Sequence, residues 1–484
     1  MRILKQYKGL ALIIIVFGVI YSLISLVNHY NFRTYALDLG AYTNAMYDYI
    51  HFRWNDSAVF KEIEENLLAD HFDLYLIFFS PLSLVFGTYT LLIVQIAAVL
   101  AGGAGVWFCF RLRNPHGNIP LYAALYFYLF FGVYSALSFD YHSNVVAASL
   151  LPWLFYSVRK RNLGAAALLL ALMLVSKENV SLWLLFVCLG IAVEYRKETR
   201  IRNFMLFSSI ICGAAFIMIV SLIMPAFSNS GDYPHFHYSF LGSNYKEAFL
   251  HLVSHPLESL KVLFVNHNNS RLGDYVKLEL HLLLAVSGLP ILLFRPAYLL
   301  MLIPVYFQKL FHDNYYMWGI ADQYSIEFAP VMAIGIFAVI SGIRKKRLAG
   351  VLSILVLLLT FASAFRVMDN TVIHTDKVNI RFYQKQHYTR AYDVAAVHKV
   401  LSGLPPDAIV SAQSPFLPHL ALRDRIYQFP VIRDAEYIVL SFSEVPYPLT
   451  EAEFRMTTDS LEASGQWHVL YEGEIVILQR DGIY

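Results

Sequence analysis

The stretch Val175-Ser-Lys-Glu-Asn-Val180 places two charges and an amide between two long apolar runs, residues 168–175 and 183–193. Apolar runs on both sides of a short polar break are typical of two consecutive membrane-spanning helices. A lysine and a glutamate are costly to hold at the end of a span, so Lys177 and Glu178 are candidate functional residues.

The composition of the whole chain also indicates a membrane protein. Of its 484 residues, 57% are hydrophobic and 15% are charged, which predicts a polytopic membrane protein. The formal net charge is +2 and the basic residues occur in short clusters, so we expect no nucleic acid partner. Cys109, Cys188 and Cys212 lie inside apolar runs and are predicted to be small core residues, not disulfides or metal ligands.

At about 20 apolar residues per crossing, the hydropathy predicts about eleven spans. The first is interpreted as an uncleaved span, because its apolar run is too long for a signal peptide and no small-residue cleavage site follows it. Several spans are short, which suggests that their outer ends line a wet cavity or stop below the membrane surface. The spans are expected near residues 10–28, 88–110, 119–137, 145–158, 162–175, 180–193, 203–224, 279–294, 297–311, 324–343 and 348–365.

Basic residues give the expected orientation, because short cytoplasmic loops are rich in lysine and arginine. These residues follow every second predicted span. The N-terminus is therefore expected in the cytoplasm, and the C-terminal part on the extracytoplasmic side of the inner membrane. The clusters are Arg111 and Arg113; Arg159, Lys160 and Arg161; Arg196, Lys197, Arg200 and Arg202; Arg295; and Arg344, Lys345, Lys346 and Arg347.

The predicted fold class is mostly α, with a transmembrane domain over residues 1–369 and a small extracytoplasmic α/β domain over residues 370–484. Residues 29–87 and 225–278 are expected to form two outer loops. Within the first loop, residues 74–86 are apolar but too short to cross, which predicts an interfacial or re-entrant helix.

The C-terminal part has the patterns of short helices and strands in a sheet with mixed pairing. Helices are expected at 389–401 and 450–463 and strands at 408–412 and 435–440, followed by a hairpin of 467–471 with 474–479.

Polar groups gather on the predicted outer face, whereas the predicted cytoplasmic loops are simply basic. This asymmetry predicts one extracytoplasmic site. The groups are Asp38; Asp70 with His71; Asp140 and His142 within residues 138–144; Lys177 with Glu178 and Asn179; and residues 312–316.

Each group also has a purely structural interpretation. Asp38 fits a helix cap. Asp70 with His71, and Asp140 with His142, offer ligands for a divalent ion but also fit hydrogen-bonded pairs. Lys177 and Glu178 fit a helix end that reaches the membrane interface. The tyrosines of residues 312–316 fit an interfacial aromatic belt, and the histidines scattered over 235–267 lack ligand spacing, so no function is assigned to them.

Several short motifs, in order, resemble the domain-of-unknown-function 2079 family of predicted membrane proteins. The resemblance covers nearly the whole chain. In two places where the family commonly shows a carboxylate, this chain has Asn144 and Asn179. The motifs are Leu37-Asp-Leu-Gly40, Asp70-His-Phe72, Phe139-Asp-Tyr-His142 and Lys177-Glu178, then Val410-Ser-Ala-Gln413, Pro418-His-Leu420, Arg423 and Ile426-Tyr-Gln-Phe-Pro430.

That family is in turn similar in layout to GT-C type glycosyltransferases, which take a sugar from a polyprenyl phosphate carrier. The resemblance implies a membrane enzyme of the cell envelope that transfers a glycosyl group on the extracytoplasmic face. Its expected partners are the bilayer, a lipid-linked sugar donor and an acceptor of unknown identity.

The same resemblance implies functions for the outer-face residues. Asp38 is expected to be the general base and Lys177 the cation that faces the phosphate, while Glu178 either holds Lys177 or supplies a second carboxylate. Substrate contacts are expected from Asp70, His71, Asp140, His142 and Asn179. A divalent cation, Mg²⁺ or Mn²⁺, is a candidate cofactor, with candidate ligands Asp38, Asp70, His71, Asp140 and His142.

Two other functions are compatible with the pattern. A transporter or flippase for a lipid-linked or anionic substrate would place polar groups across the bilayer midplane and show internal pseudo-symmetry, and the sequence shows little of either. A membrane scaffold whose outer domain binds a glycan is the third possibility.

Overall fold

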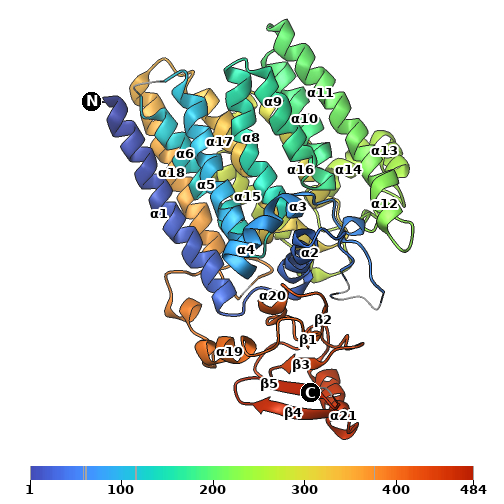
Figure 1. Cartoon of the computed structure of the whole chain (residues 1–484). Coiled ribbons are helices and arrows are strands. Elements are labelled where there is room, and N and C mark those ends of the chain that lie inside the picture. Colours follow the sequence, from blue (N-terminus) through green and yellow to red (C-terminus); the bar gives the residue numbers. More distant parts are fainter. Residues whose placement is uncertain (1, 58, 60–62, 115–116, 375, 483–484) are drawn as a thin grey trace.

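Long helices build most of the chain, and a small sheet lies near its C-terminal end (Figure 1). The computed structural model describes the chain except residues 1, 58, 60–62, 115–116, 375 and 483–484. The mostly α fold class is therefore confirmed. The bundle helices are α1 (Arg2–Tyr30), α5 (Thr90–Arg111), α6 (Ile119–Leu129), α7 (Phe131–Leu137), α8 (Ser143–Arg159), α9 (Leu163–Leu174), α10 (Glu178–Glu194), α11 (Thr199–Met218), α15 (Val276–Val286), α16 (Ala297–Leu310), α17 (Phe328–Ile340) and α18 (Lys346–Asp369).

Each of the eleven segments expected to cross the membrane contains a helix, but the helices differ in length. Within the described residues, four helical stretches are long and apolar enough to cross by themselves, and six if each of two bent pairs is one span. The bent pairs are α6 with α7, at 45°, and residues Tyr315–Ser325 with α17, at 70°. Eleven crossings therefore stay a prediction. The four long stretches are Gln6–Tyr30, Tyr75–Arg111, Thr199–Phe227 and Lys346–Asp369.

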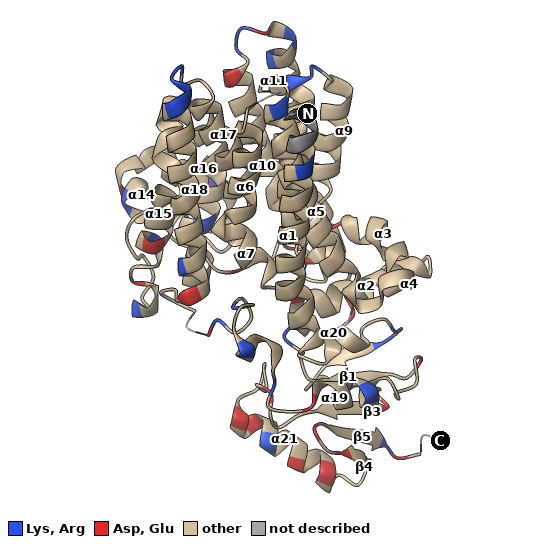
Figure 2. Ribbon diagram, turned by 90° about the vertical axis from the view of Figure 1, so that its left-hand side faces the viewer, with Lys and Arg blue, Asp and Glu red and all other residues tan. Residues whose placement is uncertain are grey.

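The two ends of the bundle differ in charge. Figure 2 shows clusters of lysine and arginine at the end that carries the N-terminus, while the sheet lies beyond the opposite end. The basic loops that follow α5, α8, α10 and α17 thus share one end, as the alternation along the sequence predicts.

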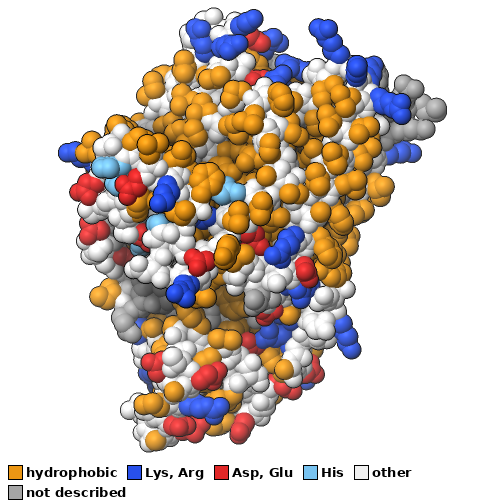
Figure 3. All heavy atoms as spheres, turned by 180° about the vertical axis from the view of Figure 1, so that it is seen from behind, with side chains coloured by type: hydrophobic (Ala, Val, Ile, Leu, Met, Phe, Trp, Pro, Cys, Tyr) orange, Lys and Arg blue, Asp and Glu red, His pale blue; other side chains and the backbone are white. Residues whose placement is uncertain are grey.

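A wide apolar surface lies between these ends (Figure 3). On α11, for example, Phe207 is 63% exposed and Ile210 is 69% exposed. Similar exposed side chains on α1 and α18 include Ile15 and Leu358. An apolar surface of this extent suits contact with lipid and is not expected in water. Inside the bundle, by contrast, all three cysteines are free and buried, as predicted.

Short helices leave the bundle after α1. A π-helical turn, Ala36–Gly40, continues into α2 (Ala41–Ile50), and α3 (Tyr75–Phe79) and α4 (Ser83–Phe86) precede α5. Figure 2 shows α3 and α4 projecting beside the bundle. Leu84 and Val85 on α4 are 76% and 74% exposed, which suits a helix at the membrane surface. The segment after α11 holds α12 (Met224–Phe227), α13 (Tyr245–Ser254) and α14 (Pro256–Val262).

The sheet has five strands in the order β2-β1-β3-β5-β4. Strand β1 pairs in parallel with β2 and β3, whereas β5 pairs antiparallel with the central strand β3 and with β4. Mixed pairing, the hairpin and two of the other strands were expected, but β2 was not. The elements are α19 (Val394–Leu401), β1 (Val410–Ala412), α20 (Leu417–Leu420), β2 (Ile426–Gln428), β3 (Tyr437–Leu440), α21 (Glu451–Ala463), β4 (Trp467–Glu472) and β5 (Val476–Arg480).

The C-terminal sheet and its helices pack directly on the segment between α1 and α5. Asn44 on α2 donates hydrogen bonds to the carbonyls of Ala421 and Arg423, at 3.2 and 2.8 Å. A Cβ on Gly40 would lie 2.5 Å from Leu417 Cδ2 on α20. The absence of a side chain at Gly40 therefore lets the turn that carries Asp38 approach the sheet domain closely.

Candidate functional site

Lys177, His71 and Glu178 form one hydrogen-bonded chain at the N-terminal end of α10. Lys177 Nζ lies 3.3 Å from His71 Nε2, and His71 Nδ1 lies 3.2 Å from Glu178 Oε1. Lysine only donates, so Nε2 accepts a hydrogen bond from Lys177, and Nδ1–H donates one to Glu178. Burial and the charge of Lys177 lower the pKa of His71, which favours this neutral tautomer. Glu178 therefore holds Lys177 through His71.

The other carboxylate oxygen of Glu178 fixes the loop around His71. Phe72 N donates to Glu178 Oε2 at 3.2 Å, and Leu74 N donates to the carbonyl of Val175 at 3.0 Å. Glu178 is 2% exposed, so its hydrogen bonds with His71 and Phe72 are shielded from water. Residues 70–74 and 175–178, far apart in sequence, are thus held together as one unit.

Asp70 and His235 extend this cluster. His235 Nε2 lies 3.2 Å from Asp70 Oδ1 and 2.6 Å from the Asp70 carbonyl oxygen. Its ring stacks on the ring of His71, with centroids 4.4 Å apart. Burial raises the pKa of Asp70, but His71 and His235 outweigh it and hold that pKa well below its ordinary value. His235 was given no function from the sequence, and no spacing signal identifies it, because it reaches the cluster from the second outer segment.

Asp38 and His142 form the second part of the site. His142 Nε2 lies 3.4 Å from Asp38 Oδ1. Burial opposes ionisation of Asp38, but His142, Lys177 and His71 together lower its pKa. Asp38 is therefore an ionised carboxylate at neutral pH, within the electrostatic reach of Lys177. The side chain of His142 is only 3% exposed and that of Asp38 is 18% exposed, so Asp38 is the more accessible member.

Asp140 accepts hydrogen bonds from the backbone on both sides of Asp38. Asp140 Oδ2 accepts a hydrogen bond from Tyr35 N at 3.0 Å, and the backbone N–H of Leu39 also donates to this carboxyl. Asp140 is 1% exposed; burial and the nearby charge of Asp38 raise its pKa. In this structure Asp140 positions the turn of Asp38, whereas the sequence predicts that it contacts substrate or metal.

Asp73 and Tyr42 are neighbours that the sequence did not single out. Asp73 Oδ1 accepts from Tyr75 N at 2.9 Å, and burial raises the pKa of Asp73 to about 7. Asp73 and Asp38 both act electrostatically on the hydroxyl of Tyr42. In the sequence, Asp73 could have been recognised only by its closeness to Asp70 and His71.

A further polar group continues from His142 toward the chain after α18. Asp322 has a left-handed backbone, with φ 56°, and its Oδ2 lies 4.0 Å from His374 Nε2. Asp322 also lies within electrostatic reach of His142. Lys377 also lies close to Asp322, and burial lowers its pKa to about 8. These residues follow α16 and α18, and no motif marks them.

Two expected contributors lie at the edge of the arrangement. Asn179 is half-buried and its Oδ1 has no hydrogen-bond partner among the described residues. Asp313 of residues 312–316 accepts from Ser239 N at 2.9 Å and lines a separate cavity of about 560 Å³. The structure therefore brings Asp70, His71, His235, Lys177 and Glu178 into contact. The pair of Asp38 and His142 completes this cluster through the charges of Lys177 and His71, whereas His312, of residues 312–316, reaches it only through the charge of His235.

The cluster has two chemical capacities. An ionised carboxylate near an ammonium can accept a proton while the cation stabilises a developing anion. One oxygen or nitrogen each from Asp70, His71 and His235 lie within 4.8 Å of one another, which can hold a metal ion. Two imidazoles and a carboxylate suit Mn²⁺ or Zn²⁺ better than Mg²⁺, which prefers oxygen ligands.

A solved structure shares this fold over nearly its whole length. The crystal structure of ArnT from Cupriavidus metallidurans bound to undecaprenyl phosphate aligns with a TM-score of 0.54 over 98% of this chain and 97% of that chain. The identity is 11%, so the likeness concerns the fold, and it supports the GT-C-like layout expected from the sequence. A comparison with curated protein sequences gave no match.

A family profile covers almost the same extent of the chain. The family described as predicted membrane protein (DUF2079) matches residues 28–478. This range contains every residue of the cluster, from Asp38 to His235. The resemblance drawn from the short motifs is thereby confirmed: the chain belongs to the DUF2079 family of predicted membrane proteins.

Proposed function

We propose that this protein transfers a glycosyl group from a polyprenyl phosphate donor to an acceptor on the extracytoplasmic face of the inner membrane. The observation that carries the proposal is the cluster of Asp38 with Lys177, which combines a carboxylate and a cation at the bundle end opposite the basic loops. The likeness to a fold whose crystal structure holds undecaprenyl phosphate supports it. In this proposal the chain crosses the membrane about eleven times, with the N-terminus in the cytoplasm.

Asp38 is the proposed general base. The acceptor hydroxyl oxygen attacks the anomeric carbon, the bond from that carbon to the donor phosphate oxygen breaks, and Asp38 takes the hydroxyl proton. His142 orients the carboxylate by its contact with Oδ1. Because Asp140 holds the backbone at Tyr35 and Leu39, the base is fixed before substrate binds.

Lys177 is the proposed phosphate-facing cation. The departing polyprenyl phosphate gains negative charge as the sugar leaves, and an ammonium close by stabilises it. The chain from Lys177 through His71 to Glu178 limits the positions that the ammonium adopts. Lys177 is half-buried, so its interaction with phosphate is screened less than in bulk water.

A divalent cation is a proposed cofactor, with Asp70, His71 and His235 as ligands. When bound, it would supply positive charge for an anionic substrate group. Lys177 donates a hydrogen bond to His71 Nε2, the ring nitrogen whose lone pair a metal ion would also need. Lys177 and a metal ion therefore compete for His71, and the protein's own residues suffice for the proton transfer described above.

The test compares lipid-linked sugars in cells with and without the protein. Accumulation of one polyprenyl phosphate sugar in cells that lack it is expected, and would identify the donor. Wild-type protein should reverse the accumulation, while Asp38→Asn and Lys177→Ala should not, although both remain folded in the membrane. Unchanged lipid-linked sugars and glycans in the absence of the protein would refute the proposal.

A further inference from the structure

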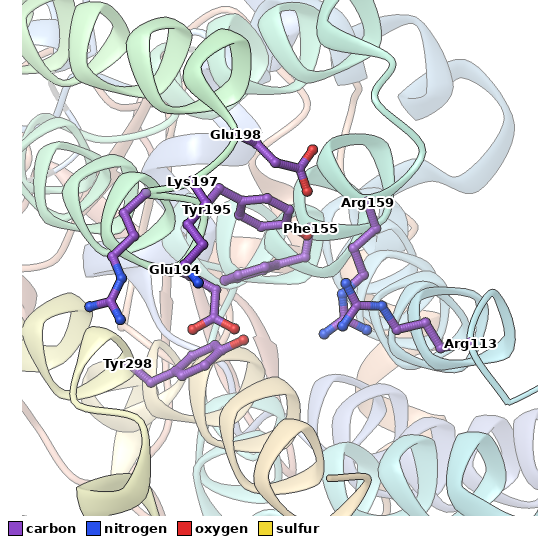
Figure 4. A pocket seen from close by; sticks show the side chains of 9 residues that line it. Arg113, Phe155, Arg159, Glu194, Tyr195, Lys197, Glu198 and Tyr298 are labelled. Atoms are coloured by element: carbon purple, nitrogen blue, oxygen red, sulfur yellow. The ribbon is translucent and has the colours of Figure 1, made fainter.

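A second cavity lies at the opposite, basic end of the bundle (Figure 4). Its volume is about 260 Å³. It lies between the turn after α5, the ends of α8 and α10 and the first turn of α16, so three bundle helices and two connecting turns contribute to it. The lining residues are Arg113, Phe155, Arg159, Glu194, Tyr195, Arg196, Lys197, Glu198 and Tyr298.

The floor of this cavity is aromatic and closed. Phe155 is 2% exposed and Tyr298 is 1% exposed. Figure 4 shows the Tyr298 hydroxyl pointing toward Arg159 and Arg113. A buried aromatic floor with one hydroxyl excludes water from one side of a ligand and strengthens charge interactions there.

Positive charge dominates the cavity wall. Four lining residues are basic and two are acidic. Both acidic residues already have cations outside the lining: Glu194 pairs with Arg295, and Glu198 Oε2 lies 3.1 Å from Arg161 Nε. The basic side chains of the wall therefore keep their charge uncompensated.

Two of the three arginines of the wall point to the same place, Arg159 from α8 and Arg113 from the turn after α5. Figure 4 shows the side chains of Arg113 and Arg159 converging. Both act electrostatically on the hydroxyl of Tyr195 and the thiol of Cys109. Arg159 is held by a 3.0 Å hydrogen bond to the Cys109 carbonyl and lies 4.8 Å from the Phe110 ring. Arg113 has no carboxylate partner among the described residues. An anion between the converging guanidinium groups would be attracted by both.

We propose that this cavity binds a phosphate group between Arg113 and Arg159. Guanidinium groups bind phosphate oxygens in pairs of hydrogen bonds, and basic pockets between helices at the cytoplasmic end of membrane proteins take up lipid head groups. The cavity volume is about 260 Å³, whereas pockets for drug-sized ligands measure about 300–1,000 Å³. A single phosphate or a phospholipid head group therefore fits better than a nucleotide.

The inference is independent of the proposed glycosyl transfer, because the cavity and the Asp38 cluster lie at opposite ends of the bundle. The phosphate can come from an anionic phospholipid or from a soluble phosphate. Full-length protein in detergent should be titrated by calorimetry with short-chain phosphatidylglycerol, with short-chain phosphatidylcholine and with inorganic phosphate. Binding of phosphatidylglycerol alone assigns a lipid head group, and binding of inorganic phosphate with similar affinity assigns a soluble phosphate.

The decisive variant is Arg113→Gln, because Arg113 is exposed and forms no ion pair with a carboxylate among the described residues. Loss of one charge-assisted contact should weaken binding about tenfold or more. Arg344→Gln is the matched control, since it removes the same charge from an exposed position at the same end but outside the cavity. Equal weakening by both variants, or no binding of either phosphate probe to the wild type, would overturn the proposal.

Discussion

His142 Nε2 lies 3.4 Å from Asp38 Oδ1, so an imidazole after α7 contacts a carboxylate of the first outer loop. The pair connects two segments separated by α5, α6 and α7 in sequence. It also gives Asp38 an orientation that a flexible loop would not provide.

Substitution His142→Asn should therefore lower glycosyl transfer about tenfold to a hundredfold, because the hydrogen bond to an ionised carboxylate is lost. The measurement is the rate at which the variant restores the lipid-linked sugar profile of cells that lack the protein. His255→Asn, at an exposed position away from the cluster, is the control and should restore it fully. A wild-type rate for His142→Asn would separate His142 from the reaction.

Glu178→Gln should destabilise the protein and displace Lys177. The amide group of glutamine presents a donor where His71 Nδ1 or Phe72 N now donates, so one buried bond is lost. The expected cost is about 1–3 kcal/mol, measured as a lower thermal unfolding midpoint in detergent. Glu258→Gln, exposed on α14, should leave the midpoint unchanged; an equal change in both variants would contradict the buried role of Glu178.

Metal affinity should respond in opposite directions to two substitutions. His235→Ala removes a ligand and should weaken Mn²⁺ binding at least about tenfold, whereas Lys177→Ala removes the competitor for His71 Nε2 and should strengthen it. Calorimetric titration of the purified protein after chelation measures both. His237→Ala, outside the metal group, serves as the control. Weaker binding in the Lys177 variant would show that Lys177 and the ion do not compete.

Lys377 should make stability depend on pH. Burial lowers its pKa from 10.5 to about 8, so below about pH 8 the folded protein carries a buried charge at a cost. As pH rises from about 8 to 10.5 the folded state has already lost the proton that the unfolded state still binds, so the wild type gains stability. Lys377→Met removes this dependence, and its advantage over the wild type in unfolding midpoint should shrink between pH 7 and pH 10. At neutral pH the stability that Lys377→Met gains over the wild type is roughly 3 kcal/mol at most, from the change in the pKa of Lys377.

The exposed Lys385 provides the control for this measurement. Lys385→Met should shift the midpoint equally little at both pH values. A constant difference between the wild type and Lys377→Met over the same range would show that the lysine does not titrate as its burial requires.

Much of the site follows from local sequence, but its connections do not. Lys177 and Glu178 were expected because they interrupt an apolar stretch, and charge next to lipid is unfavourable without a purpose. Asp38 and His71 were expected because the polar groups gather on one predicted face and match short family motifs. His235 carries no such signal, since it lies in a long polar segment rich in histidine. Its membership arises from a contact with Asp70 over more than a hundred residues of sequence, which no local pattern encodes.

The sequence by itself determined that this is a helical membrane protein of the DUF2079 family, with basic loops at one end of its bundle and a small sheet at the other. Hydropathy and charge determine these features because each residue's transfer energy between water and lipid is a local property. Only the tertiary structure decided that Glu178 holds Lys177 through His71, that Asp140 supports Asp38 from behind, and that His235 joins Asp70. These relationships depend on distances of a few ångströms between distant segments, which the packing of helices and the docking of the C-terminal domain set together.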